Sequence, residues 1–147
     1  MPIGTIENRL HLYSRIRTRL FTFLLSSQFK AAASGVRISP PFRCFGLNEI
    51  VLGQRVQIER DCWIQTIPSD SDKPDDNAKL VIGSHAGIGM GAHISAAQQV
   101  VIGEYVLLAR NVHISDHSHA FENIDIPIML QGISGLAPVS IGRSTWL

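Results

Sequence analysis

A six-residue repeat constrains the fold of this chain more than any other feature of its sequence. From Leu52 onward an aliphatic residue leads each of a series of hexads, and longer steps interrupt the series in only three places. The leading residues are Leu52, Ile58, Ile64, Ile82, Ile88, Ile94, Ile102, Leu108, Ile114, Ile141 and Leu147. Neither the period of an amphipathic helix nor the alternation of a half-buried strand gives this spacing. The period therefore indicates a solenoid of stacked repeats.

Three consecutive hexads make one triangular coil. A small or β-branched residue stands four positions after each lead, at Val56, Cys62, Ala86, Ala92, Val106, Val112 and Thr145. We expect both sets to point into the narrow interior. We also expect backbone freedom at tight corners from the glycines that follow the leads, which are Gly53, Gly83, Gly89, Gly103 and Gly142. Such coils stack and share backbone hydrogen bonds. The sequence thus predicts a mainly β protein with a parallel β-helix over residues 36–147, in which Val36, Ile38, Phe42 and Phe45 form an irregular cap or a first coil.

Residues 1–35 are predicted to form an N-terminal helical appendage. Residues 5–33 contain no proline or glycine, and Leu10, Tyr13, Ile16, Leu20, Phe23 and Leu24 recur at spacings of three and four. We expect Gly35 to end the helix. Arg15, Arg17 and Arg19 lie beside the apolar stripe. Two interpretations stay open: the helix packs on its own domain or a neighbouring subunit, or it rests on an anionic membrane surface.

Breaks in the hexad register predict loops. Between Ile64 and Ile82 about twelve residues leave the coil, giving a polar loop at about 68–79. Its acidic residues resemble a calcium loop, but the glycine and the terminal glutamate of such a loop are absent. Ile94 and Ile102 are eight residues apart, which requires only a two-residue bulge. A longer break places a loop at 115–137, and long loops on rigid scaffolds often carry function.

Composition narrows the class of protein. Apolar residues make up 45% of the 147 residues and charged residues 17%, which excludes a disordered chain and suits one domain with some surface hidden in an oligomer. A net charge of +1 gives no field that would recruit nucleic acid. Two distant cysteines suit a reducing compartment, so we expect a cytoplasmic protein. The apolar run Leu20–Leu25 is too short to span a bilayer.

Two motifs flank the long loop. Ser115, Asp116, His117, Ser118 and His119 match the pattern S-D-H-x-H, and Pro138, Val139, Ile141, Gly142, Trp146 and Leu147 match PV-IG---W(I/L). From about residue 50 onward the chain resembles the hexapeptide-repeat acyltransferases, nearest to the galactoside, maltose, lipopolysaccharide and capsule O-acetyltransferases. The resemblance implies a left-handed β-helix, a homotrimer, acetyl-CoA as acyl donor and a saccharide hydroxyl as acceptor, with no metal. It also implies a chain that continues beyond the position of Leu147.

The resemblance assigns His117 as general base in a direct transfer within a ternary complex. An imidazole suits this role because its ordinary pKa lies near the working pH. Since neighbouring side chains of an extended segment point in opposite directions, we expect Asp116 to hold His119 or the loop backbone rather than His117. His119 is expected to contact substrate or anchor the loop. Trp146 matches the tryptophan beside the CoA arm, although packing at a coil corner is an equal alternative.

A column of aromatic residues supports a second enzymatic interpretation. Trp63, His93 and His113 occupy equivalent hexad positions, so His93 and His113 should lie one rung apart, about 5 Å. Together with His117 they suggest a metal site at a subunit seam, as in γ-class carbonic anhydrases, where zinc needs three converging imidazoles. A non-catalytic trimeric scaffold is a further alternative. So is a membrane-surface assembly factor that docks through residues 10–25 at the inner face of the membrane.

Overall fold

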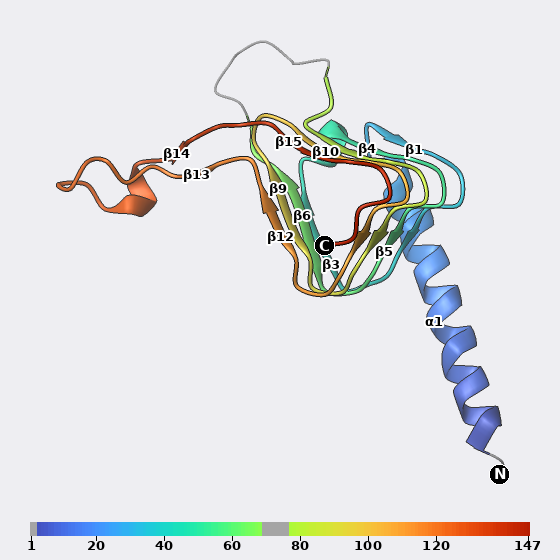
Figure 1. The fold of residues 1–147 in the computed structure, drawn as a ribbon. Helices are drawn as coiled ribbons and strands as arrows, with labels where there is room; N and C mark the ends of the chain where they lie inside the picture. Colours follow the sequence, from blue (N-terminus) through green and yellow to red (C-terminus); the bar gives the residue numbers. More distant parts are fainter. Residues whose placement is uncertain (1–2, 69–76) are drawn as a thin grey trace.

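A computed structural model, which describes residues 3–68 and 77–147, shows a parallel β-helix preceded by one long helix, α1 (Ile3–Ser26) (Figure 1). Sheet A contains β1 (Ala31–Ala32), β4 (Ile50–Leu52), β7 (Leu80–Ile82), β10 (Val100–Ile102) and β15 (Val139–Ile141). Sheet B contains β2 (Arg37–Ile38), β5 (Gln57–Ile58), β8 (Gly87–Ile88) and β11 (Leu107–Leu108). Sheet C contains β3 (Phe42–Phe45), β6 (Cys62–Thr66), β9 (His93–Ala96) and β12 (His113–Ser115). The predicted fold class is confirmed.

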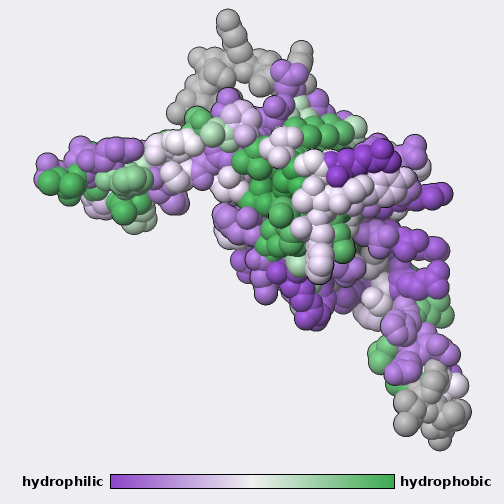
Figure 2. All heavy atoms as spheres, viewed as in Figure 1, coloured by the Kyte–Doolittle hydropathy of each residue, from purple (hydrophilic) through white to green (hydrophobic). Residues whose placement is uncertain are grey.

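The hexad leads from Leu52 to Ile114 form the core as predicted, whereas Ile141 is only partly buried and Leu147 is exposed. Ile58 pairs in register with Ile88, and Ile64 pairs with Ile94, so identical positions stack from coil to coil. The leads from Leu52 to Ile114 are all buried. The residues four positions later are also buried from Val56 to Val106. Figure 2, viewed like Figure 1, shows hydrophobic side chains gathered within the triangular section and mostly hydrophilic ones around it.

The glycines after the leads have a different role from the one predicted. None of them has a positive φ; that conformation falls three positions after the lead, for example at Arg55, His85 and Tyr105. At Gly53, Gly83, Gly89 and Gly103, though not at Gly142, glycine is required instead because the next coil passes too close for a side chain. A Cβ on Gly83 would meet the backbone nitrogen of Glu104 at 2.6 Å. The spacing between coils, rather than the turn, therefore selects glycine here.

The helix ends earlier than Gly35. It stops at Ser26, whose hydroxyl donates to the carbonyl of Phe23, and Phe29 enters the core. The strand Ala31–Ala32 pairs with Val51–Leu52, so the backbone between Ser26 and Gly35 is already part of a coil. Val36, Ile38, Phe42 and Phe45 accordingly belong to a regular first coil rather than to an irregular cap.

Helix α1 covers part of the first edge of the solenoid. Strand β2 is the edge of sheet B, and its Ile38 N–H donates to the Thr22 hydroxyl at 2.9 Å, where a further strand would otherwise lie. That hydroxyl donates to the Thr18 carbonyl, and Arg17 donates to the carbonyl of Pro40 at 3.0 Å. A polar side-chain cap satisfies backbone groups that an open edge leaves unpaired.

The apolar stripe of α1 faces away from the β-helix. Thr18 and Thr22 are buried, whereas Leu10, Tyr13, Ile16, Leu20, Phe23 and Leu24 are all exposed. The helix extends beyond the coils in Figure 1. The helix does pack on its own domain, through Thr18, Thr22 and the partly buried Phe21 and Leu25, whereas the exposed stripe is left open to a neighbouring subunit or a membrane surface. None of the described helices is long and apolar enough to cross a membrane.

Both predicted long loops interrupt the coils at the corner between sheets C and A. The loop at 68–79 leaves after β6 and returns at β7, but most of it, including its acidic residues, lies outside the described residues. The loop at 115–137 forms a projecting arm (Figure 1). Antiparallel strands β13 (Ser118–His119) and β14 (Ile133–Ser134) make its stem, with a short 3-10 helix η2 (Ile128–Leu130) beyond them. A second 3-10 helix, η1 (Leu47–Glu49), precedes β4.

Candidate active site

His117 lies where the arm leaves the solenoid. Strand β12 pairs with β9 in the register Ile114 with Ile94 and Ser115 with Ser95, which fixes the position of the chain just before the histidine. The side chain of His117 is 10% exposed and that of Asp116 is fully buried. The corner between sheets C and A thus holds a nearly enclosed histidine and carboxylate at the root of the arm.

Asp116 is held by the predicted two-residue bulge. The backbone N–H groups of Ala97, Gln98 and Gln99 donate to its carboxylate at 2.8, 2.8 and 2.7 Å. Three successive N–H groups that converge on one carboxylate form an anion-binding nest. The bulge therefore supplies the donors that allow a carboxylate to be buried at this corner.

Asp116 also contacts His117 directly. Its Oδ1 lies 2.8 Å from Nδ1 of the His117 ring. The expectation that the two side chains point apart is wrong, because β12 ends at Ser115 and strand alternation does not continue into the arm. Asp116 was expected to hold His119 or the backbone of its own loop, but its carboxylate instead holds the backbone of the bulge. With Nδ1–H assigned as the donor to the carboxylate, the lone pair of Nε2 is left to accept a proton.

The charge state of Asp116 suits this arrangement. Burial raises the pKa of its carboxyl group, but hydrogen bonds from the Ala97 N–H, the His117 ring and the next two backbone amides outweigh burial. The net pKa lies below its ordinary value of 3.8. Asp116 is therefore a carboxylate at neutral pH, and it stabilises an imidazolium if His117 takes up a proton.

Two serines lie beside the His117 ring and a glutamine holds one of them, and the sequence motifs did not point to all three. Ser115 Oγ donates to the His117 carbonyl at 2.8 Å, and it lies 3.3 Å from Nδ1. Ser95 Oγ lies 3.5 Å from Nε2 and accepts a hydrogen bond from the Gln65 amide at 2.9 Å. Gln65, Ser95 and Ser115 each follow a hexad lead directly and stack in one column. The hexad register was the signal that could have identified them.

The predicted aromatic column lies beside the site on sheet C. Trp63 stacks on His93 with ring centroids 4.7 Å apart, and His93 meets His113 edge to face at 4.7 Å. The His93 Nε2 atom is buried and has no hydrogen-bond partner among the described residues. Burial lowers the pKa of His93 most, followed by the charges of His113 and His117, so its ring is neutral at neutral pH. Trp63 and His93 line a surface hollow of about 360 Å³.

The remaining predicted residues lie apart from His117. His119 is exposed on β13, and no hydrogen bond within the described part of the chain joins it to His117. Trp146 is 76% exposed and forms a parallel bridge with Leu107 on sheet B. Leu107 lines a hollow of about 340 Å³ together with His85, Gly87 and Tyr105. His117 and Trp146 thus belong to different faces of the triangular coil.

The residues that the structure describes contain no group of three His, Cys, Asp or Glu side chains placed to hold a metal ion. His93 and His113 are in contact, but their rings meet edge to face. The Nδ1 atom of His117 faces the carboxylate of Asp116. His93 and His113 therefore make a ring-packing contact, and His117 makes a hydrogen bond to a carboxylate.

Comparison with known proteins gives similarity in structure alone. A scan of the sequence against protein-family models gives no match, and a search for similar curated proteins gives none either. Solved structures of AntD, an N-acyltransferase from Bacillus cereus, share the fold. A mutant of AntD in complex with dTDP and coenzyme A aligns with a TM-score of 0.62 and 13% identity. Another, in complex with dTDP-4-amino-4,6-dideoxyglucose and coenzyme A, aligns with a TM-score of 0.61 and 15% identity.

These alignments cover 84% and 78% of this chain, but only 62% and 58% of the AntD chains. The chain therefore spans about three fifths of the length of the structures that it matches. At this level of identity the likeness shows a shared β-helix fold.

Proposed function

We propose that this chain is an acyl-CoA-dependent acyltransferase that transfers an acetyl group to a saccharide hydroxyl, with His117 as general base. The observation that carries the proposal is the ordered dyad at the root of the arm. Asp116 is fixed by three backbone amides and accepts from Nδ1 of His117 at 2.8 Å. This orientation is the one that a general base requires, because Nε2 is left as the proton acceptor.

The proposed reaction is a direct transfer. The acceptor hydroxyl gives its proton to Nε2 of His117 while its oxygen attacks the thioester carbonyl of acetyl-CoA. The new carbon–oxygen bond forms, the carbon–sulfur bond breaks, and the leaving thiolate takes the proton from His117. The Asp116 carboxylate stabilises the imidazolium between these steps. Ser95, 3.5 Å from Nε2, lies close to the path of the proton.

The acceptor is proposed to be a sugar, as part of a surface polysaccharide or its precursor. AntD, which shares the fold, is an N-acyltransferase solved with a dTDP-linked amino sugar. The loop motif S-D-H-x-H resembles that of O-acetyltransferases instead. A hydroxyl and an amine differ in how strongly they need a base, since a hydroxyl is a poor nucleophile until it loses its proton, whereas a neutral amine attacks through its lone pair. Acceptor panels should therefore include matched amino and hydroxyl sugars.

We propose a homotrimer in which the site forms between subunits. His117 lies at the corner of sheets C and A, whereas Trp146, the proposed contact for the CoA arm, lies on sheet B. A site that uses both side chains needs two copies of the chain. The arm also carries exposed apolar residues, with Ile124 at 95% and Met129 at 81% exposure, as expected for a surface that a neighbour covers.

Release of the CoA thiol from acetyl-CoA, measured with the acceptor panel, tests the proposal. His117→Ala is expected to lower kcat by about a hundredfold to ten-thousandfold, the usual contribution of a general base. His11→Ala, on the exposed surface of α1, is the matched control and should leave the rate unchanged. Retained transfer in the His117→Ala variant would contradict the assigned base. A folded trimer without any acyl-CoA affinity would favour the scaffold alternative.

A mixing experiment tests the shared site. His117→Ala and Trp146→Ala subunits are each expected to form nearly inactive trimers. Co-expression of the two in equal amounts should restore activity at about a quarter of the sites, because each site then draws His117 and Trp146 from different subunits. If both residues act within one chain, mixing restores nothing.

We also propose that the protein is cytoplasmic and attaches to the inner face of the membrane through α1. The outward apolar stripe of α1 is bordered by Arg15 and Arg19, the pattern of an interfacial helix. Flotation with anionic vesicles should show binding that weakens with salt. The Phe23→Ser variant, which removes a side chain that is 75% exposed, should bind less. Binding to vesicles that is equal in both proteins would contradict attachment through this stripe.

A further inference from the structure

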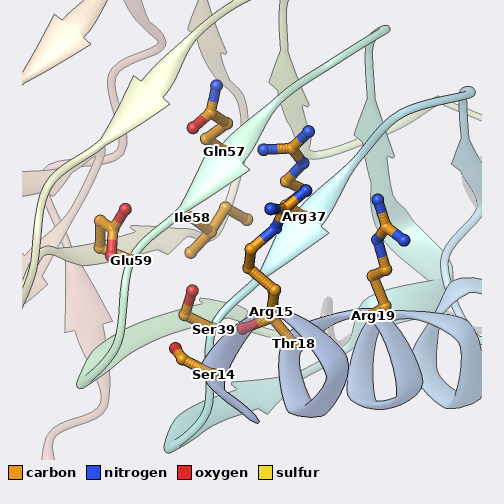
Figure 3. A pocket seen from close by; sticks show the side chains of 9 residues that line it. All are labelled: Ser14, Arg15, Thr18, Arg19, Arg37, Ser39, Gln57, Ile58 and Glu59. Atoms are coloured by element: carbon orange, nitrogen blue, oxygen red, sulfur yellow. The ribbon is translucent and has the colours of Figure 1, made fainter. Parts of the chain in front are cut away.

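A basic pocket lies between α1 and sheet B, on a different face from His117. Its volume is about 220 Å³. Arg15 and Arg19 come from consecutive turns of α1, and Arg37 comes from β2. In Figure 3 the two helix arginines extend toward the strand that carries Arg37. The same sequence spacing that places Arg15 and Arg19 on one side of the helix therefore aims them at one hollow.

The guanidinium groups of this pocket are not paired with any carboxylate of residues 3–68 and 77–147. Among the described residues none of Arg15, Arg19 and Arg37 forms an ion pair. One carboxylate, that of Glu59, also lines the pocket, and Figure 3 shows it at the far side from Arg19. Three positive groups against one negative group leave the hollow electropositive. Like charges held together favour an anion that neutralises them.

The pocket also offers neutral donors. Ser14 and Ser39 lie on the same side of it in Figure 3, and Thr18 is part of its floor. Hydroxyl groups and guanidinium forks are the donors that phosphate oxygens accept most strongly. The small volume suits a phosphate or pyrophosphate group better than a drug-sized organic molecule.

The walls of the pocket are held together by hydrogen bonds between side chains of α1 and the backbone of the first coil. Thr22 accepts the Ile38 N–H at 2.9 Å, and Arg17 donates to the carbonyl of Pro40 at 3.0 Å. These contacts join α1 to the segment that contains Arg37 and Ser39. The arginines of the helix and of the coil are thus brought together by the backbone contacts that close the sheet edge.

We propose that this pocket binds a phosphate-bearing group, either of a soluble pyrophosphate compound or of an anionic lipid headgroup at the membrane surface. The proposal is independent of the acyltransferase function, since it rests on α1, β2 and β5 and not on the arm. A lipid headgroup could reach the pocket from the membrane surface because Arg15 and Arg19 border the outward apolar stripe of α1. Both sources present the same phosphate oxygens to the same three guanidinium groups.

Binding to the full chain is measured by calorimetry with sodium pyrophosphate at constant ionic strength, and by co-sedimentation with phosphatidylcholine vesicles with and without phosphatidate. Wild-type protein is expected to bind one of the two probes. Arg37→Gln and, separately, Arg15→Gln should each weaken that binding about tenfold or more, because each loses a charge-assisted contact. Arg110→Gln, which changes an exposed arginine of a later coil that does not line the pocket, should bind as wild type.

The two binding measurements distinguish a soluble ligand from a lipid. Pyrophosphate binding that is lost in Arg37→Gln and Arg15→Gln supports a soluble ligand, and vesicle binding that is lost in the same variants supports a lipid. The Arg15 variant alters only an exposed helix position, so it remains informative if Arg37→Gln does not fold. The proposal is overturned if neither probe binds, or if Arg110→Gln weakens binding as much as the pocket variants do.

Discussion

The chain departs from its hexad repeat twice near His117, and the two departures differ in almost every physical respect. The bulge at Ala97–Gln99 adds two residues to the coil, and its backbone amides point at a buried carboxylate. The arm adds many more residues, and its tip is exposed, with Ile124 at 95%. Asp116, the residue that the bulge holds, lies at the root of the arm.

This difference indicates which residues near His117 are held in a fixed position and which are not. No side chain of the bulge takes part in the proposed reaction, yet the backbone of the bulge fixes the carboxylate that orients His117. The arm supplies Asp116 and His117 at its root, while its tip has few contacts with the coils. Small insertions in a solenoid can therefore be parts of a site, because their freed backbone amides become donors. The ordered part of a long loop is the part that such donors hold.

The largest expected effect comes from removing the Asp116 carboxylate, which joins the bulge to the root of the arm. Asp116→Ala leaves the three N–H groups of the bulge without their acceptor and His117 without its carboxylate, so we expect a loss of about 3 kcal/mol in the free energy of unfolding. Urea denaturation measures the loss. Asp125→Ala, an exposed aspartate of the arm, is the matched control and should change stability by no more than about 0.5 kcal/mol.

Asp116→Asn sharpens the same comparison. The amide keeps the shape of the side chain and one acceptor oxygen, but its NH₂ group meets a donor of the nest or of the His117 ring. Stability should fall between that of wild type and Asp116→Ala, and acyl transfer should fall as strongly as in Asp116→Ala. Equal stability of the Asn variant and wild type would show that the charge at the nest is unimportant.

The repeat architecture was predictable from the sequence because its determinants are local and periodic. The leads, the small residues four positions later, and the column of Trp63, His93 and His113 all follow from counting in sixes. The two-residue bulge was also visible as a step of eight. What counting could not reveal was that the amides of the bulge point at Asp116, since that contact joins residues 17 to 19 positions apart.

The errors have a common physical origin in tertiary contacts. Strand alternation suggested that Asp116 points away from His117, but the strand ends at Ser115. Helical periodicity continued the N-terminal helix to Gly35, but Ala31 and Ala32 pair with a strand about 20 residues away. In each case a long-range hydrogen bond overrode a local preference. The same holds for the apolar stripe of α1, which faces outward because Thr18 and Thr22 cap a sheet edge.

A smaller effect is expected from shortening the arm. Replacing residues 121–131 with Asn-Gly should preserve the hairpin of β13 and β14, since that dipeptide forms the turn of a two-residue hairpin. At concentrations at which both proteins are monomeric, unfolding by urea should change by no more than about 0.5 kcal/mol, because the tip is solvent-exposed. Sedimentation at higher concentrations should show weaker trimer formation. A loss of monomer stability as large as that of Asp116→Ala would contradict the contrast between root and tip.

The smallest expected effect concerns His93, one rung below His113 and close to the dyad. Burial first, and then the charges of His113 and His117, lower its pKa below the ordinary value of 6.5. Between the lowered pKa and 6.5 the unfolded chain binds more protons at this position than the folded chain, so the free energy of unfolding rises with pH across that window. Acidification through 6.5 should therefore destabilise the wild type, and His93→Gln should reduce this slope, measured by urea denaturation at several pH values. If the slope is unchanged in His93→Gln, the proton uptake arises elsewhere, and the neutral ring wedged between Trp63 and His113 is not the group that couples this corner to pH.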